Sequence, residues 1–171
     1  QSSEQVSELE RAKKWSNAFS EAGYISSYHT ESTSPYNFDP NEWLGKDMIY
    51  YDNHGFVDWA GITSNQIPNL RNSLVLAMAC LTCAYDEASD KSMLFCTNTL
   101  RKGAIGFFGA CSVDVNVNYI IYKNILNNIF YRNRDLGQTT TYSLQGSPTI
   151  LLGDPTIDIN NPYTLLRPLG R

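Results

Sequence analysis

The segment SLVLAMAC, residues 73–80, decides the fold class of this chain. Residues 73–79 form a nearly continuous apolar run, which is typical of a β-strand buried on both faces. Residues 104–110 (AIGFFGA) form a second run of this kind, and residues 47–52 form an earlier strand. Strands buried on both faces occur mainly in parallel sheets that helices cover on each side.

Apolar residues at helical spacing flank and separate these strands. The helical pattern covers residues 4–22, 88–102 and 117–132. Ser2 or Ser3 can cap the first helix, and Gly23 can end it in a left-handed conformation. We also expect a short strand at 24–30 and a loop or edge strand at 138–147. The alternation of strands and helices predicts an α/β fold, a three-layer αβα sandwich with a mostly parallel sheet.

Composition limits the classes of function. The chain has 171 residues, of which 42% are hydrophobic, so it can form one domain with a substantial core. The formal net charge of −4 argues against a nucleic-acid partner or an acidic membrane surface. No run approaches the roughly 18 apolar residues of a membrane span, and we expect no transmembrane segment. No signal-peptide pattern is present, and the first residue is Gln1, which favours a processed chain.

His54 and Cys80 each lie just beyond the end of a predicted strand. Ligand sites in parallel sheets lie past the carboxyl ends of the strands, and neighbouring strands are about 4.8 Å apart. If the two strands are parallel neighbours, both side chains therefore emerge at the same edge. A thiol can attack a carbonyl carbon, and an imidazole can protonate the departing amine. This pair predicts acyl-transfer chemistry at the sheet edge.

The same reaction needs donors for the oxyanion that forms on the attacked carbonyl. The backbone N–H of Gly55 is one candidate, because glycine allows a substrate to approach the main chain closely. The backbone N–H of Cys80 is the second candidate.

Several sequence blocks resemble the caspase-like cysteine peptidases, which include caspases, legumains and gingipains. YYDNHG (50–55) and LVLAMAC (74–80) are similar to their paired His-Gly and Ala-Cys blocks, and the gingipain-type family is the most similar. Three further segments support this resemblance, namely ACLTCAYD (79–86), LRKGAIGFFGACSVD (100–114) and ILLGDPTI (150–157). The resemblance covers about residues 45–158 and implies a catalytic domain, or its carboxyl-side portion, over residues 1–171.

The resemblance implies roles for individual residues. His54 would be the catalytic histidine and Cys80 the nucleophile, with Gly55 in the oxyanion hole. The substrate pocket would follow the next strand and contain Ser112, Val113 and Asp114, where the Asp114 carboxylate would favour a basic P1 side chain. We expect no cofactor and no metal.

Two features depart from the family pattern. Cys83 stands where the family often has glycine or another small residue. The fold also normally begins with a central strand before its first helix, and this chain starts with a helix. We therefore expect a processed precursor or a second chain that supplies the strand, and family habits favour a secreted or surface location.

Other interpretations remain open. The domain could be a catalytically silent binding or structural module, or a thiol redox protein that uses Cys80 and Cys83. A zinc site is disfavoured because the chain has one C-x-x-C pair and no second chelating pair. Pairing among Cys83, Cys96 and Cys111 cannot be decided from sequence. Trp59 is expected to pack in the core or to touch substrate, and Asp154 is expected to form a turn.

Overall fold

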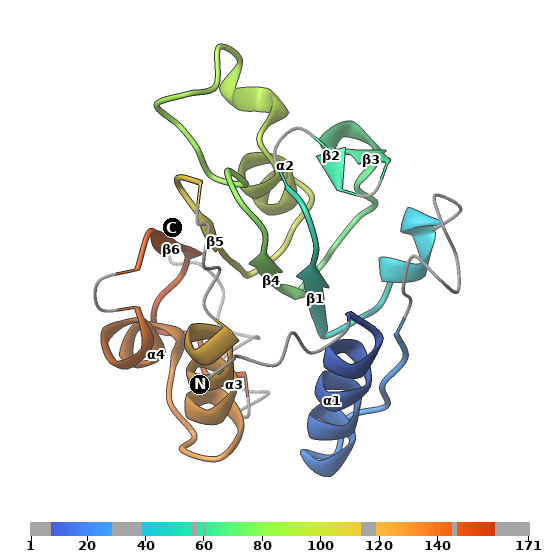
Figure 1. The fold of residues 1–171 in the computed structure, drawn as a ribbon, viewed down its shortest axis with the longest axis vertical. Helices are drawn as coiled ribbons and strands as arrows, with labels where there is room; N and C mark the ends of the chain where they lie inside the picture. Colours follow the sequence, from blue (N-terminus) through green and yellow to red (C-terminus); the bar gives the residue numbers. More distant parts are fainter. Residues whose placement is uncertain are drawn as a thin grey trace, which may run out of the picture. The chain divides into compact units, whose positions relative to one another are not determined.

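The computed structural model describes residues 8–28, 39–55, 58–59, 61–113, 119–144 and 147–159 (Figure 1). The chain divides into two compact units, residues 1–39 and residues 40–171. None of the helices in the described part of the chain is long and apolar enough to cross a membrane.

The first unit contains helix α1, Glu8–Glu21. The helix ends as the sequence predicts, because Gly23 has a φ of 91° and the N–H of Tyr24 donates to the carbonyl of Phe19 at 3.0 Å. The predicted caps Ser2 and Ser3 lie outside the described residues. The predicted strand at 24–30 is wrong over its described part: residues 24–28 form no strand, and the side chain of Ile25 is fully exposed, so no apolar face is buried there.

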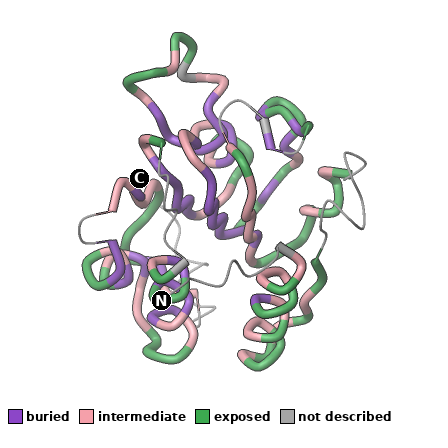
Figure 2. The backbone as a smooth tube through the Cα atoms, in the orientation of Figure 1, coloured by how far each residue is buried: buried purple, intermediate pink, exposed green. Residues whose placement is uncertain are grey.

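The second unit is built on a four-stranded sheet with the order β1-β4-β5-β6. Its strands are β1 Met48–Asp52, β4 Leu74–Met78, β5 Gly106–Ala110 and β6 Thr149–Gly153. β1, β4 and β5 run parallel, and β6 pairs antiparallel with β5. Every residue of β4 and β5 is buried, as their apolar runs predicted (Figure 2). The mostly parallel sheet of the sequence analysis is therefore confirmed.

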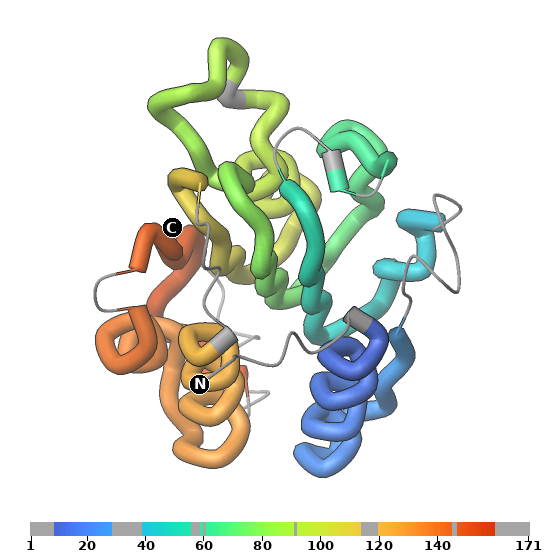
Figure 3. The backbone as a smooth tube through the Cα atoms, in the orientation of Figure 1, coloured from blue at the N-terminus to red at the C-terminus, as the bar shows by residue number. Residues whose placement is uncertain are grey.

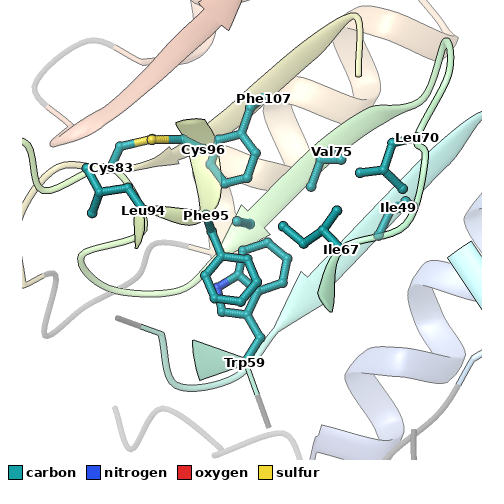
Figure 4. Packing of buried hydrophobic residues seen from close by; sticks show 11 residues of the cluster. Ile49, Trp59, Ile67, Leu70, Val75, Cys83, Leu94, Phe95, Cys96 and Phe107 are labelled. Carbon is teal, nitrogen blue, oxygen red and sulfur yellow. The ribbon is translucent and has the colours of Figure 1, made fainter. Parts of the chain in front are cut away.

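Helices cover both faces of this sheet. On one face, Val75 and Phe107 pack in a cluster with Phe95 of α2 (Phe95–Arg101) and with Trp59 of the β2–β3 hairpin (Figure 4). The hairpin strands are β2 Asp58–Trp59 and β3 Ile62–Thr63. The 3-10 turn η2 Ser64–Gln66 follows β3, and a further 3-10 turn, η3 Lys91–Met93, lies between β4 and α2. Another 3-10 turn, η1 Pro40–Trp43, precedes β1.

The opposite face carries α3 Tyr119–Phe130 and α4 Leu136–Ser143. Tyr122 of α3 packs edge-on against Tyr50 of β1, with ring centroids 6.1 Å apart. The side-chain amide of Asn128 donates to the hydroxyl of Ser143 at 2.9 Å and joins the two helices. Since α2 and the hairpin lie on the other face, the second unit has three layers, as predicted.

Tyr122 also donates its hydroxyl hydrogen to the carbonyl oxygen of Ala77 in β4, and its side chain is only 1% exposed. Tyr122→Phe should lower the free energy of unfolding by about 1–2 kcal/mol, because a buried acceptor loses its donor while the ring packing is kept. Urea unfolding measures this change. An unchanged midpoint would show that the hydroxyl does not stabilise the attachment of α3 to the sheet.

Two predictions about secondary structure are wrong. The helix expected at 88–102 begins only at Phe95, because the Asp90 carboxylate accepts hydrogen bonds from the N–H and hydroxyl of Ser92 and holds a turn there. Most of the loop or edge strand expected at 138–147 is helix α4. Its cap is Asp135, whose carboxylate accepts from the N–H of Gln138 at 2.7 Å.

The turn expected at Asp154 is confirmed. Its carboxylate accepts from the N–H of Thr156 at 2.8 Å and from the Thr156 hydroxyl at 2.7 Å. These two hydrogen bonds, from the hydroxyl and then from the backbone, hold the pKa of Asp154 below its ordinary value.

Candidate active site

His54 and Cys80 leave the sheet at the same edge. β1 and β4 are parallel neighbours, and their paired residues differ by 26 in number, as Met48 and Leu74 do. His54 and Cys80 also differ by 26, and each lies two residues beyond the end of its strand. Figure 3 shows the two strands side by side. His54 is exposed and Cys80 is partly exposed.

Gly55 lies directly against the turn that carries Cys80. A Cβ atom added to Gly55 would lie 2.6 Å from the carbonyl oxygen of Cys80 and 2.7 Å from the Cβ of Ala79. Real Cβ atoms essentially never make contacts this short. Only glycine therefore allows the His54 loop and the Cys80 turn to touch, a packing reason that the sequence analysis did not foresee.

Two backbone hydrogen bonds fasten the Cys80 turn to the end of β5. The N–H of Cys83 donates to the carbonyl of Ala110 at 2.9 Å, and the N–H of Leu81 donates to the carbonyl of Ser112 at 3.3 Å. Leu81 takes a left-handed φ of 57° to make this turn. The structure thus brings Ser112 next to the Cys80 turn, and Val113 follows with 57% of its surface exposed. Asp114 lies outside the described residues.

Tyr51 also holds the His54 loop. The hydroxyl of Tyr51 donates to the carbonyl of His54 at 2.7 Å. The Tyr51 ring stacks on Trp59 with centroids 4.2 Å apart, and Trp59 stacks on Phe95 at the same distance. Trp59 is 1% exposed, so it packs in the core, which is one of the two roles expected for it. Tyr51 was not among the predicted site residues: its place three residues before His54 is visible in the sequence, but its hydrogen bond to the His54 carbonyl is not.

The other cysteines have different surroundings from Cys80. None of the four cysteines forms a disulfide. Cys83 is fully buried and its thiol interacts with that of Cys96, not with solvent. Burial is the main cause that raises the pKa of Cys83 well above its ordinary value, so this thiol stays neutral. Burial also raises the pKa of Cys111, with smaller contributions from Cys96 and Asp86.

No metal site is visible in the described residues, which contain no group of three or more His, Cys, Asp or Glu side chains that could hold an ion. At this edge of the sheet the structure places an exposed histidine, His54, and a partly exposed cysteine, Cys80. Together they can perform nucleophilic attack and proton transfer on one bound carbonyl compound.

The chain is similar to one known family of peptidases. A family model described as peptidase family C25 matches residues 2–160, which is most of the chain. No curated protein and no solved structure matches the chain.

Proposed function

Since the chain belongs to peptidase family C25, the gingipain family of cysteine peptidases, we propose that His54 and Cys80 form its catalytic dyad. The observation that carries this proposal is the shared register of the two residues past β1 and β4. The close packing of Gly55 on the Cys80 turn supports it, because it holds the two loops together.

The proposed reaction follows from these positions. The sulfur of Cys80 attacks the carbonyl carbon of the scissile peptide bond, and the backbone N–H groups of Gly55 and Cys80 stabilise the oxyanion. His54 takes the thiol proton of Cys80 as the sulfur attacks and then delivers it to the nitrogen of the departing amine, and the C–N bond breaks. The thioester left on Cys80 is then hydrolysed by water, which releases the acid product and restores the thiol.

We further propose that the chain cleaves after basic P1 residues. Ser112 and Val113 follow β5, and the carbonyl of Ser112 accepts a hydrogen bond from the N–H of Leu81 in the Cys80 turn. Asp114 comes next in sequence, and its carboxylate would pair with an arginine or lysine side chain of the substrate.

A fluorogenic peptide library with each residue type at P1 tests the function. We expect turnover of peptides with Arg or Lys at P1, and Asp114→Asn should weaken that preference without abolishing cleavage of other peptides. If the chain cleaves only after non-basic residues, the proposed preference for a basic P1 residue is wrong, but the proposed peptidase activity stands. If no peptide in the library is cleaved, the silent binding-module interpretation replaces the dyad.

Tyr51 should contribute to activity as a positioning residue. Tyr51→Phe keeps the stack on Trp59 and removes the hydrogen bond to the carbonyl of His54. Such a bond stabilises by about 0.5–1.5 kcal/mol, so kcat/KM should fall by about 2- to 10-fold. When kcat and KM are measured separately, kcat should fall and KM should change little, because the variant shifts the imidazole and not the substrate pocket. Equal kinetics for both proteins would remove Tyr51 from the mechanism.

The edge of the sheet at β1 bears on a partner for this chain. β1 is the outermost strand on its side of the sheet within the described residues. We propose that another chain, or the remainder of a longer precursor, adds a strand beside β1, and that the protein is secreted or lies at the cell surface. Size-exclusion chromatography with intact mass tests the partner: a stable, active monomer of 19.3 kDa would contradict it.

A further inference from the structure

Two buried cysteine side chains meet behind the Cys80 turn. Cys83 belongs to that turn and Cys96 to the first turn of α2, and both are 0% exposed. Figure 4 shows the two side chains directed toward one another. The N–H of Cys96 donates to the carbonyl of Thr82 at 3.3 Å, which brings the two backbone segments together as well.

We propose that Cys83 and Cys96 form a disulfide when the chain folds under oxidising conditions, and that this bond ties the Cys80 turn to α2. The bond would be a covalent modification site that leaves Cys80 as a free thiol. The inference stands on the packing of the two side chains and does not depend on the proposed peptidase activity.

The geometry distinguishes this pair from the alternatives. Cys83 and Cys96 lie within one buried cluster with their side chains directed toward one another, whereas Cys111 is only partly buried and packs against the outside of that cluster. Cys80 is partly exposed, and Cys83 is fully buried beside Cys96. A bond between Cys80 and Cys83 would require Cys83 to leave its buried partner.

The oxidant in this proposal is a small-molecule disulfide. One thiolate of the pair attacks it and releases one thiol, which leaves a mixed disulfide on the protein. The second cysteine then attacks the mixed disulfide, forms the Cys83–Cys96 bond and releases the second thiol. The protein loses two electrons and two protons, and the oxidant gains them. Because both sulfurs are fully buried, the exchange takes place before the core closes.

The bond should stabilise the fold by restricting the unfolded chain. It would close the loop between positions 83 and 96, and loops of roughly this size give about 3 kcal/mol in the chain-entropy model. For a chain of this length that corresponds to a rise in Tm of about 6–12 °C. The loop that the bond closes begins in the turn that carries Cys80.

Peptide mapping tests the connectivity. The full chain is refolded with reduced and oxidised glutathione, denatured, alkylated and digested without reductant. We expect one cross-linked peptide that joins Cys83 to Cys96, with Cys80 and Cys111 alkylated. Alkylation of all four cysteines, or any bond that includes Cys80 or Cys111, would overturn the proposal.

Thermal unfolding with and without reductant gives a second readout. Tm of the wild type and of Cys111→Ala should drop by about 6–12 °C on reduction. Cys83→Ala and Cys96→Ala should show no such drop. A drop that persists in these two variants would contradict the assignment. If neither variant folds, the peptide map of the wild-type chain decides.

Discussion

Cys80→Ala is expected to lower kcat/KM for peptide cleavage by about 10⁴- to 10⁶-fold, the range found when a catalytic nucleophile is removed. The reason is chemical, because the variant has no atom that can form the thioester. The fold should be kept, since the side chain is partly exposed at the end of β4 and shortening it leaves no large cavity. Fluorogenic peptide kinetics and Tm measure the two effects separately.

Cys111→Ala is the matched control for this variant. Cys111 is also partly exposed and also follows a central strand, β5. It should retain cleavage within about threefold, because no step of the reaction uses its thiol and its sulfur lies outside the dyad. If Cys80→Ala cleaves as well as Cys111→Ala, Cys80 is not the nucleophile.

Gly55→Ala is the second large effect that we expect. The new methyl group would overlap the carbonyl oxygen of Cys80 and the Cβ of Ala79, which are backbone or backbone-attached atoms that cannot rotate away. The His54 loop must therefore move away from the Cys80 turn. A displacement near 1 Å can lower the rate by about 100-fold, and overpacking costs about 1–3 kcal/mol of folding free energy.

Gly45→Ala separates this contact from a general effect of replacing glycine. Gly45 has a φ of 69° and no atom within 4 Å of an added Cβ. The control should lose about 1–2 kcal/mol of stability through backbone strain and keep its kcat/KM. Urea unfolding and peptide kinetics distinguish the two variants. A Gly55→Ala enzyme with normal kinetics would show that the two loops need not touch.

The position of the candidate dyad could be predicted from sequence because parallel strands convert sequence position into spatial position. The apolar runs that end before His54 and Cys80 predict neighbouring buried strands, and parallel pairing places both ends at one edge. A buried apolar run predicted β5, and a glycine after a helical pattern predicted the left-handed end of α1 at Gly23. These features depend on local patterns that one sequence carries.

The missed features depend on contacts between distant segments. α4 contains a glycine and three threonines, which disfavour a helix, yet the Asp135 cap and the packing of Leu136 in the core stabilise it. The Tyr51–Trp59–Phe95 stack and the meeting of Cys83 with Cys96 likewise join residues whose proximity no local pattern predicts. Tertiary packing decides each of them.

The rate of alkylation at each cysteine tests the dyad most directly. In the proposed dyad, His54 takes the proton of the Cys80 thiol as the sulfur attacks an electrophile, so iodoacetamide should label Cys80 first in the native protein. Cys111 should react more slowly because burial raises its pKa, and Cys83 and Cys96 should be protected by burial. Mass spectrometry after short exposures measures the rate at each site.

The decisive comparison is wild type against His54→Ala. We predict that the variant slows the labelling of Cys80 by at least about tenfold and leaves the rate at Cys111 unchanged. Equal rates at Cys80 in the two proteins would contradict the claim that His54 and Cys80 act as one catalytic pair.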